Sequence, residues 1–169
     1  ASVVLKNGYT VGALVVANPM GSVTTASGKY FWAAPFEVDG EFGGMGVDPE
    51  HANFDGKQSL KEAAMMVFNA EMSNTTIAIV ATDAPLTKTQ CHRLAVTAHD
   101  GMARAIVPSH TPLDGDLIFG VSTTNGAVDY TIFRDIGAAA TVCLSRAIAR
   151  GIYEATSHAD DILPTYRSS

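Results

Sequence analysis

The apolar run over residues 76–80, Thr-Ile-Ala-Ile-Val, constrains the fold of this chain more than any other stretch. It is short and rich in β-branched residues, which is typical of a buried strand. A Ser-Leu-Lys-Glu capping box begins a helix pattern at residue 59 that ends near residues 72–73. A second capping box, Thr-Lys-Thr-Gln, begins a helix pattern at residue 87 that runs to about residue 106. A strand between two helices predicts a layered α/β sandwich.

The beginning of the chain predicts a hairpin. Residues 3–5 and 9–17 are both strand-like, and they are joined by Lys-Asn-Gly at residues 6–8. An Asn-Gly pair between apolar runs is a strong short-range hairpin signal. Because the second run is apolar almost throughout, we expect both of its faces to be buried.

The last third of the chain predicts two strands and a helix. Residues 117–123 form a clear strand pattern, and an Asn-Gly turn at residues 125–126 leads into a second strand-like run over residues 128–133. The final helix is then expected to begin at Arg134 or Asp135.

Residues 19–56 show no sustained periodicity and contain many glycines together with an aromatic cluster at residues 30–32. Structureless loops of this length are uncommon in compact domains. The aromatic residues favour a packed loop that covers a subunit interface or rims a substrate cleft. His51 lies in this loop without partners at ligand spacing, so it predicts no metal site.

Composition bounds the class of protein. The chain has 169 residues, 47% hydrophobic and 17% charged, as expected for one globular domain. A net charge of −6 provides no basic patch for nucleic acid. No apolar run reaches the roughly 20 residues that a membrane span needs. A start at Ala1 without a signal-peptide layout suggests a trimmed fragment, and a cytoplasmic location is the default expectation.

The Asn74-Thr75 pair just before the strand of residues 76–80 has two interpretations. Asn and Thr are common turn residues, so a simple turn is one of them. The other is a self-cleavage site, in which the Thr75 hydroxyl attacks the Asn74 carbonyl and hydrolysis leaves Thr75 as a new N-terminus. A hydroxyl needs a base beside it, and a free α-amine with a pKa of about 7.7–8.0 can be that base.

Two further polar segments lie next to predicted strands. Asn18 follows the run of residues 9–17, where a turn residue is common. Asp114 and Asp116 precede the strand of residues 117–123 and are two residues apart, so both carboxylates can reach one spot while Gly115 leaves room. A solvated turn and a calcium loop are alternatives, but no calcium-loop spacing follows.

The segments 74–87, 99–106 and 110–116 together resemble the self-processing N-terminal-nucleophile hydrolases of the β-aminopeptidase/D-aminopeptidase (DmpA-like) family. The 6-aminohexanoate-oligomer (nylon) hydrolases of that family are the most similar, since their nucleophile is a Thr after Asn. The resemblance extends over nearly the whole chain, which corresponds to the C-terminal half of such a protein. It implies an αββα sandwich, with residues 1–74 in the α-subunit and residues 75–169 forming the β-subunit after cleavage.

The resemblance also implies roles for individual residues. Thr75 would be the nucleophile, with its own amine as base, and Asn18 would donate to the oxyanion. Asp114 and Asp116 would orient Thr75. No cofactor or metal is implied, and a Lys or Tyr from the missing N-terminal half would complete the site.

The function implied by the family is hydrolysis of amide bonds in 6-aminohexanoate oligomers or in β- or D-amino-acid peptides. Its substrates are small oligoamides, and its members assemble as homo-oligomers, with a tetramer favoured; neither nucleic acid nor membrane is an expected partner. Thr82-Asp83-Ala84 also fits the self-cleaving glutamate N-acetyltransferases, although the Asp-Gly-Asp segment fits the hydrolases better. A non-catalytic assembly subunit is the second alternative.

Two other residue types are expected to be structural. Cys91 and Cys143 lie on apolar helix stripes, so we expect two small core residues rather than a disulfide. His92 and His99 share no face with a third ligand, and no histidine is expected near Thr75.

Overall fold

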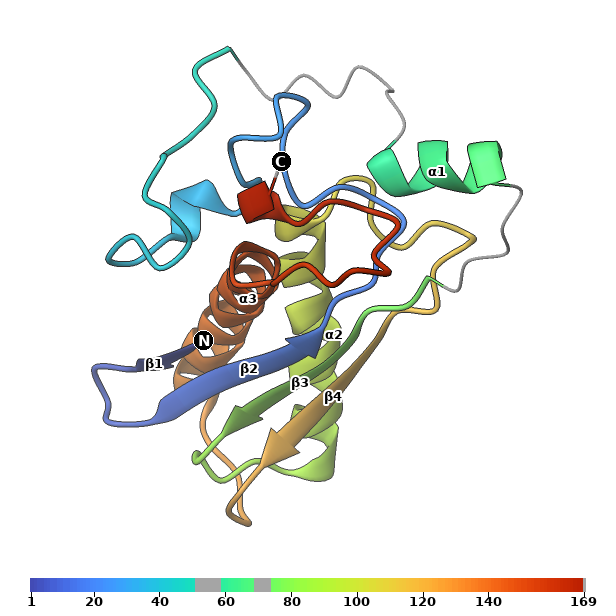
Figure 1. Ribbon diagram of the computed structural model, residues 1–169. Coiled ribbons are helices and arrows are strands. Elements are labelled where there is room, and N and C mark those ends of the chain that lie inside the picture. Colours follow the sequence, from blue (N-terminus) through green and yellow to red (C-terminus); the bar gives the residue numbers. More distant parts are fainter. Residues whose placement is uncertain (51–58, 69–73, 169) are drawn as a thin grey trace.

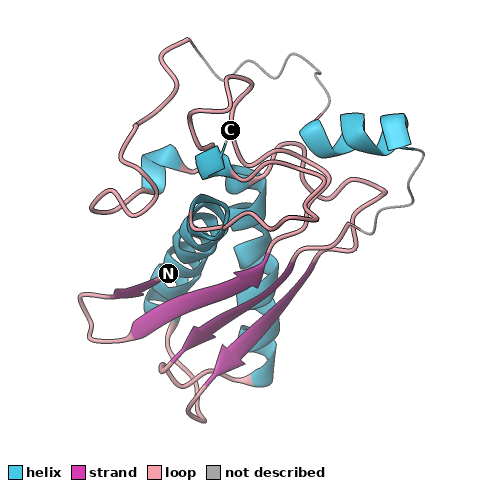
Figure 2. Ribbon diagram, viewed as in Figure 1, coloured by secondary structure: helices cyan, strands magenta, loops and turns pink. Residues whose placement is uncertain are grey.

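The computed structural model describes residues 1–50, 59–68 and 74–168 (Figure 1). In these residues a four-stranded sheet forms one layer, and two long helices form a second layer on one of its faces (Figure 2). The expected α/β class is therefore confirmed.

The sheet has the order β1-β2-β3-β4. Its strands are β1 (Ser2–Val4), β2 (Thr10–Val16), β3 (Ile77–Thr82) and β4 (Leu117–Ser122). β2 runs antiparallel to both of its neighbours, whereas β3 and β4 run parallel. The expected hairpin between β1 and β2 is confirmed, and Gly8 in its turn has a φ of 89°, in the region that favours glycine.

Three α-helices accompany the sheet: α1 (Leu60–Phe68), α2 (Lys88–Ala105) and α3 (Tyr130–Tyr153). The expected capping box of α2 is confirmed, because the side chains of Thr87 and Gln90 each accept from the other's backbone N–H. Helix α1 is also capped as expected at its start, where Ser59 Oγ accepts from Glu62 N at 3.1 Å. The end expected for α1 near residues 72–73 lies outside the described residues, as does His51.

Helices α2 and α3 approach closely through small residues. A side chain at Gly101 would lie only 2.5 Å from the carbonyl oxygen of Thr141. The Ser145 hydroxyl donates across the same contact to Gly101 O at 2.9 Å. This close contact makes the two helices one layer that covers the sheet.

The core lies between this helix layer and the sheet. Its buried residues come from every layer, and they include Val11, Ala78, Val80, Leu94, Met102, Ile118, Ile136, Leu144 and Ile148. Phe31 and Phe42 are also buried there, with ring centroids 5.4 Å apart. The loop that follows β2 is thus packed as expected. Cys143 is buried and Cys91 half-buried, and both are free thiols.

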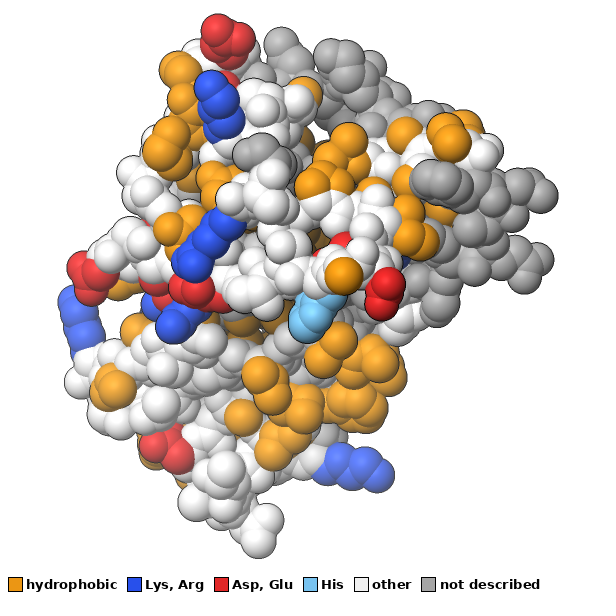
Figure 3. Space-filling view, in the orientation of Figure 1, with side chains coloured by type: hydrophobic (Ala, Val, Ile, Leu, Met, Phe, Trp, Pro, Cys, Tyr) orange, Lys and Arg blue, Asp and Glu red, His pale blue; other side chains and the backbone are white. Residues whose placement is uncertain are grey.

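The other face of the sheet is open. Leu14, Val16, Ile77, Ile79, Leu117, Phe119 and Val121 form this open sheet face, with exposed fractions from 39% to 72%. Figure 3 shows hydrophobic side chains gathered over β2, β3 and β4. Our expectation that both faces of β2 are buried was therefore wrong for the described chain, because its helices cover one face only.

A second correction concerns residues 128–133, for which we expected a strand. Helix α3 begins at Tyr130 instead, several residues before the expected start at Arg134 or Asp135. The Asp129 carboxylate accepts from Thr131 N at 2.8 Å and from Ile132 N at 3.0 Å, which satisfies the first free donors of the helix.

None of the described helices is both long enough and apolar enough to cross a lipid bilayer.

Candidate active site

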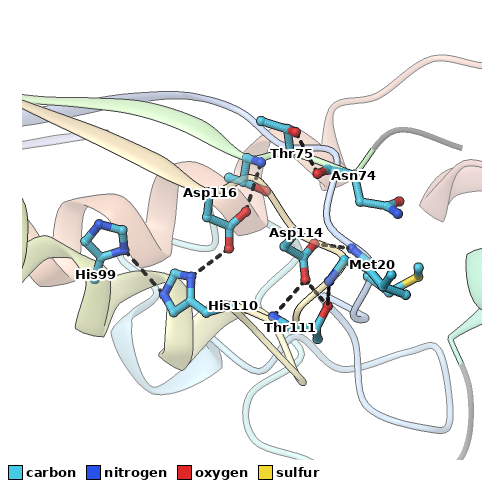
Figure 4. Close-up of polar contacts among 10 residues, drawn as sticks. Met20, Asn74, Thr75, His99, His110, Thr111, Asp114 and Asp116 are labelled. Carbon is cyan, nitrogen blue, oxygen red and sulfur yellow. Dashed lines mark hydrogen bonds and ion pairs between the residues drawn. The ribbon is translucent and has the colours of Figure 1, made fainter.

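The sheet topology brings three chain segments to one edge. β3 and β4 are parallel, so the residues that precede them lie side by side, and an isolated bridge pairs Asn74 with Asp114. β2 is antiparallel to β3, so the residues after its C-terminal end lie at the same edge. Asn18, Thr75 and the two aspartates therefore meet, as Figure 4 shows for Thr75, Asp114 and Asp116.

The Asn74–Thr75 peptide is held by hydrogen bonds on both sides. Thr75 N donates to Asn18 O at 3.0 Å, and Gly115 N donates to Asn74 O at 2.9 Å. The Thr75 hydroxyl also donates to Asn74 O, at 2.6 Å. The carbonyl that would be attacked therefore accepts two donors, one of which is the candidate nucleophile.

Residue 115 is a glycine at a position where any side chain would collide with the candidate nucleophile. A Cβ at this position would lie 2.9 Å from Thr75 Oγ1, which is closer than real Cβ contacts allow. The expectation that Gly115 leaves room is confirmed. The two carboxylates, which we expected to reach one spot, contact different partners.

The Asp114 carboxylate accepts hydrogen bonds from two loops and not from the candidate nucleophile. Its Oδ1 accepts from Met20 N at 2.9 Å. Its Oδ2 accepts from Thr111 N at 3.0 Å and from Thr111 Oγ1 at 2.6 Å. This carboxylate thus fixes the segment after β2 against the turn before β4.

Asp116 contacts the residue that follows Thr75. Its side chain is only 5% exposed, its Oδ1 accepts from Thr76 N at 3.0 Å, and its Oδ2 lies 2.7 Å from His110 Nδ1. Neither aspartate forms a hydrogen bond with the Thr75 hydroxyl in the part of the chain that is described. Asp116 thus holds the backbone N–H that follows Thr75, whereas Asp114 holds the two neighbouring loops, and direct orientation of the Thr75 hydroxyl stays a prediction.

The hydroxyl and the carboxylates lie on opposite sides of the sheet edge. In the register of β3 and β4, Thr75 shares the face of Ile77 and Leu117, which belongs to the open sheet face. Asp116 shares the face of Ile118, which is buried under the helices. Figure 4 shows the same arrangement, with Thr75 on one side and the two aspartates on the other.

Two histidines, which were not predicted from the sequence as site residues, extend the hydrogen-bonded chain that begins at Asp116. His110 Nε2 lies 3.4 Å from His99 Nδ1, and the two rings meet edge to face with centroids 4.9 Å apart. Burial, followed by the charge of His110, lowers the pKa of His99, whereas Asp116 and Asp100 oppose that shift. His110 contacts Asp116 and not the Thr75 hydroxyl, so our expectation that no histidine lies near Thr75 stays a prediction. The only sequence signal was the position of His110, six residues before Asp116.

Asn18 is held by a lysine that the sequence analysis also missed. Lys61 Nζ donates to Asn18 Oδ1 at 2.6 Å, and it lies 3.3 Å from the carbonyl oxygens of Asn18 and Pro19. Burial lowers the pKa of Lys61, and the nearby Asp114 charge opposes that shift. An open hollow of about 340 Å³ lies beside the pair, lined by Asn18, Lys61, Asp160, Asp161, Ile162 and Leu163.

Within the described ranges, no three His, Cys, Asp or Glu side chains are grouped closely enough to hold a metal ion.

Comparison with known proteins identifies relatives. Residues 1–161 match peptidase family S58. An uncharacterized aminopeptidase of Mycobacterium bovis, Mb1368, is 37% identical over 179 residues, which is 99% of this chain and 50% of that protein. The chain thus spans about half the length of this relative.

Two further proteins agree with this family. The 6-aminohexanoate-oligomer endohydrolase of Paenarthrobacter ureafaciens is 31% identical over 111 residues, which is 66% of this chain and 29% of that protein. The chain also matches the solved structure of the L-aminopeptidase D-Ala-esterase/amidase of Ochrobactrum anthropi, with a TM-score of 0.57 and 20% sequence identity. The match covers 90% of this chain and 38% of the chain in that structure. That structure is a variant of the Ntn hydrolase fold, so the expected fold is confirmed. The chain belongs to peptidase family S58.

Proposed function

We propose that this chain is part of a self-processing amide hydrolase whose nucleophile is Thr75, freed by cleavage of the Asn74–Thr75 bond. The observation that carries this proposal is that the Asn74 carbonyl oxygen accepts hydrogen bonds from both the Thr75 hydroxyl and Gly115 N. A hydroxyl beside a polarised carbonyl is the arrangement that an acyl shift requires.

Processing begins when Thr75 Oγ1 attacks the carbonyl carbon of Asn74. The negative charge that develops on the Asn74 oxygen is stabilised by Gly115 N–H, which already lies 2.9 Å from that oxygen. The C–N bond then breaks, the hydroxyl proton passes to the Thr75 nitrogen, and Asn74 is left as an ester on Thr75. Water hydrolyses the ester, which separates residues 1–74 from residues 75–169.

Turnover uses the same hydroxyl on a substrate amide. The freed amine of Thr75 takes the hydroxyl proton, Oγ1 attacks the amide carbon, and the amine product leaves with that proton. Water then releases the acyl group as a free acid. We assign Asn18 as an oxyanion donor, and Asp114 and Asp116 as the residues that orient Thr75.

We infer that the substrates are small oligoamides, either 6-aminohexanoate oligomers or peptides with β- or D-amino acids. The similarity to a 6-aminohexanoate-oligomer endohydrolase and to an aminopeptidase supports this class. The match of residues 1–161 to a peptidase family favours hydrolysis over acyl transfer to ornithine. A residue from the other half of the polypeptide and a homo-oligomeric assembly complete the proposal.

The test is the intact mass of the full-length protein and of two Thr75 variants. The wild-type protein should separate into two pieces whose masses place the cut before Thr75. Thr75→Ala should stay in one piece and hydrolyse no oligoamide, whereas Thr75→Ser keeps a hydroxyl and should still be cut. A Thr75→Ala protein that is cut or active would contradict the assignment.

The products separate the proposal from acyl transfer. The processed enzyme should release free acid from an oligoamide in the presence of ornithine. Acylated ornithine as the main product would instead identify an acyl transferase.

A further inference from the structure

The atom of Asn18 that faces Lys61 can be identified by chemistry alone. An ammonium group has three N–H donors and no acceptor, so the Asn18 side-chain atom 2.6 Å from Lys61 Nζ has to be the carbonyl oxygen. The two ends of an Asn amide are otherwise hard to tell apart, and hydrogen-bond partners decide between them. Lys61 therefore fixes which end of the Asn18 amide points away from it, namely the NH₂ group.

Lys61 is itself held in place by the start of α1. The Ser59 hydroxyl donates to Met20 O at 2.6 Å and also accepts from Glu62 N. This pair of bonds joins the first turn of α1 to the segment that follows β2. Lys61 lies in that turn, and its ammonium group also contacts the carbonyl oxygens of Asn18 and Pro19 at 3.3 Å.

The same segment is bonded to the nucleophile. Asn18 O accepts from Thr75 N at 3.0 Å, and Met20 N donates to Asp114. A change in the Asn18 side chain therefore occurs beside a backbone whose position relative to Thr75 is already fixed. Lys61 is thus placed to set the orientation of the amide, while the bonds of Thr75 N and Met20 N hold the two chain segments together.

We propose that Lys61 is a positioning residue that turns the Asn18 amide so that its NH₂ group serves the oxyanion of the substrate intermediate. This inference rests on the proposed function, because it takes Asn18 as the oxyanion donor. One of the two amide orientations presents a donor to the oxyanion and the other presents a repelling oxygen. The ammonium charge also polarises the amide, which strengthens its N–H donors.

The effect should depend on pH. The charge of Asp114 acts on Lys61, and Asp160 and Asp161 line the hollow beside it. Burial lowers the pKa of Lys61 below its ordinary value of 10.5. Once deprotonated, the amine can accept as well as donate, so it no longer determines the amide orientation. Turnover should then fall at alkaline pH.

The experiment compares Lys61→Met and Lys61→Arg in the full-length processed protein, with a small oligoamide as substrate. Removing an oxyanion donor typically lowers kcat about 100- to 1,000-fold, so loss of its orientation alone should lower kcat about 10- to 100-fold. KM should change less than about threefold, because the interaction acts on the transition state. Self-cleavage should stay complete in both variants, since Gly115 N–H serves that step.

Lys61→Arg should recover most of kcat and lose the alkaline fall, because a guanidinium stays protonated and has no acceptor. The double variant of Lys61→Met and Asn18→Ala should be no slower than Asn18→Ala alone. Wild-type kcat in Lys61→Met, impaired self-cleavage in it, or additive losses in the double variant would each overturn the inference. An Asn18→Ala enzyme with wild-type kcat would instead contradict the proposed function.

Discussion

Gly115 has two roles at the candidate cleavage site. Its N–H donates a hydrogen bond to Asn74 O, and its lack of a side chain leaves space for the Thr75 hydroxyl. Gly115→Ala would place a methyl group 2.9 Å from Thr75 Oγ1, so the hydroxyl has to shift. A small misplacement of reacting atoms can cost about 100-fold in rate, and we expect self-cleavage to slow by about 10- to 100-fold. A time course of intact mass after synthesis would measure this.

The matched control is Gly151→Ala on α3, where an added Cβ has no heavy atom within 4 Å. That variant should be cut at the wild-type rate. Equal rates for Gly115→Ala and the wild type would show that the contact between residues 115 and 75 has no part in processing.

At the residue scale, the sequence was sufficient to select side chains that the fold brings to one edge. The resemblance to the DmpA-like family selected Thr75, Asn18, Asp114 and Asp116, all of which lie next to predicted strands, and strand order then juxtaposes them. Lys61 and His110 were missed for a physical reason. Lys61 is 43 residues from Asn18 in the chain, and it reaches that residue only because α1 is tied to the segment after β2.

At the scale of single elements, the start of α3 depends on one carboxylate. Asp129 caps the helix by accepting from two backbone N–H groups. Loss of such a cap costs about 1 kcal/mol of stability, so Asp129→Ala should lower the free energy of unfolding by about that amount. Chemical denaturation of the full-length protein would measure the change.

Asp135→Ala is the control for this prediction. Asp135 lies on the same helix and forms an exposed ion pair with Arg134, with side chains 47% and 71% exposed. Exposed pairs of this kind contribute little, so its removal should change stability by less than about 0.5 kcal/mol. If the two variants were equally stable, Asp129 would not determine where α3 begins.

The elements also show what local pattern can and cannot predict. Both capping boxes and the hairpin were recognised because their signals are local hydrogen bonds. Residues 128–133 were misread because β-branched and aromatic residues favour strands by themselves, whereas here the Asp129 cap and the packing of Ile132 and Ile136 favour a helix.

At the scale of the whole molecule, the open sheet face is an exposed apolar surface of the described chain. An αββα sandwich would cover it with a second sheet from the other half of the polypeptide. Phe119, 51% exposed here, should then be buried in the full-length protein. Phe119→Ala should lower the stability of that protein by about 3 kcal/mol or more.

The control is Tyr130→Ala, since Tyr130 is 91% exposed and is the first residue of α3. That variant should lose less than about 0.5 kcal/mol. Both values come from chemical denaturation of the full-length protein. A Phe119→Ala protein as stable as Tyr130→Ala would mean that no second layer rests on this face.

The whole-molecule arrangement was the least accessible to sequence reasoning. The almost continuous apolar run of β2 predicts that both of its faces are buried, but it does not say whether the outer face is covered by this chain or by another segment. Leu14 and Val16 therefore looked like core residues, although both are 72% exposed in the described chain.

The pairing of the Thr75 hydroxyl with the carbonyl of its own neighbour also bears on timing. If the proposed self-cleavage takes place, both reacting groups belong to adjacent residues of one molecule, so the cut would follow first-order kinetics with a half-life independent of concentration. Each newly made copy would then be its own first substrate, in a reaction that it carries out only once.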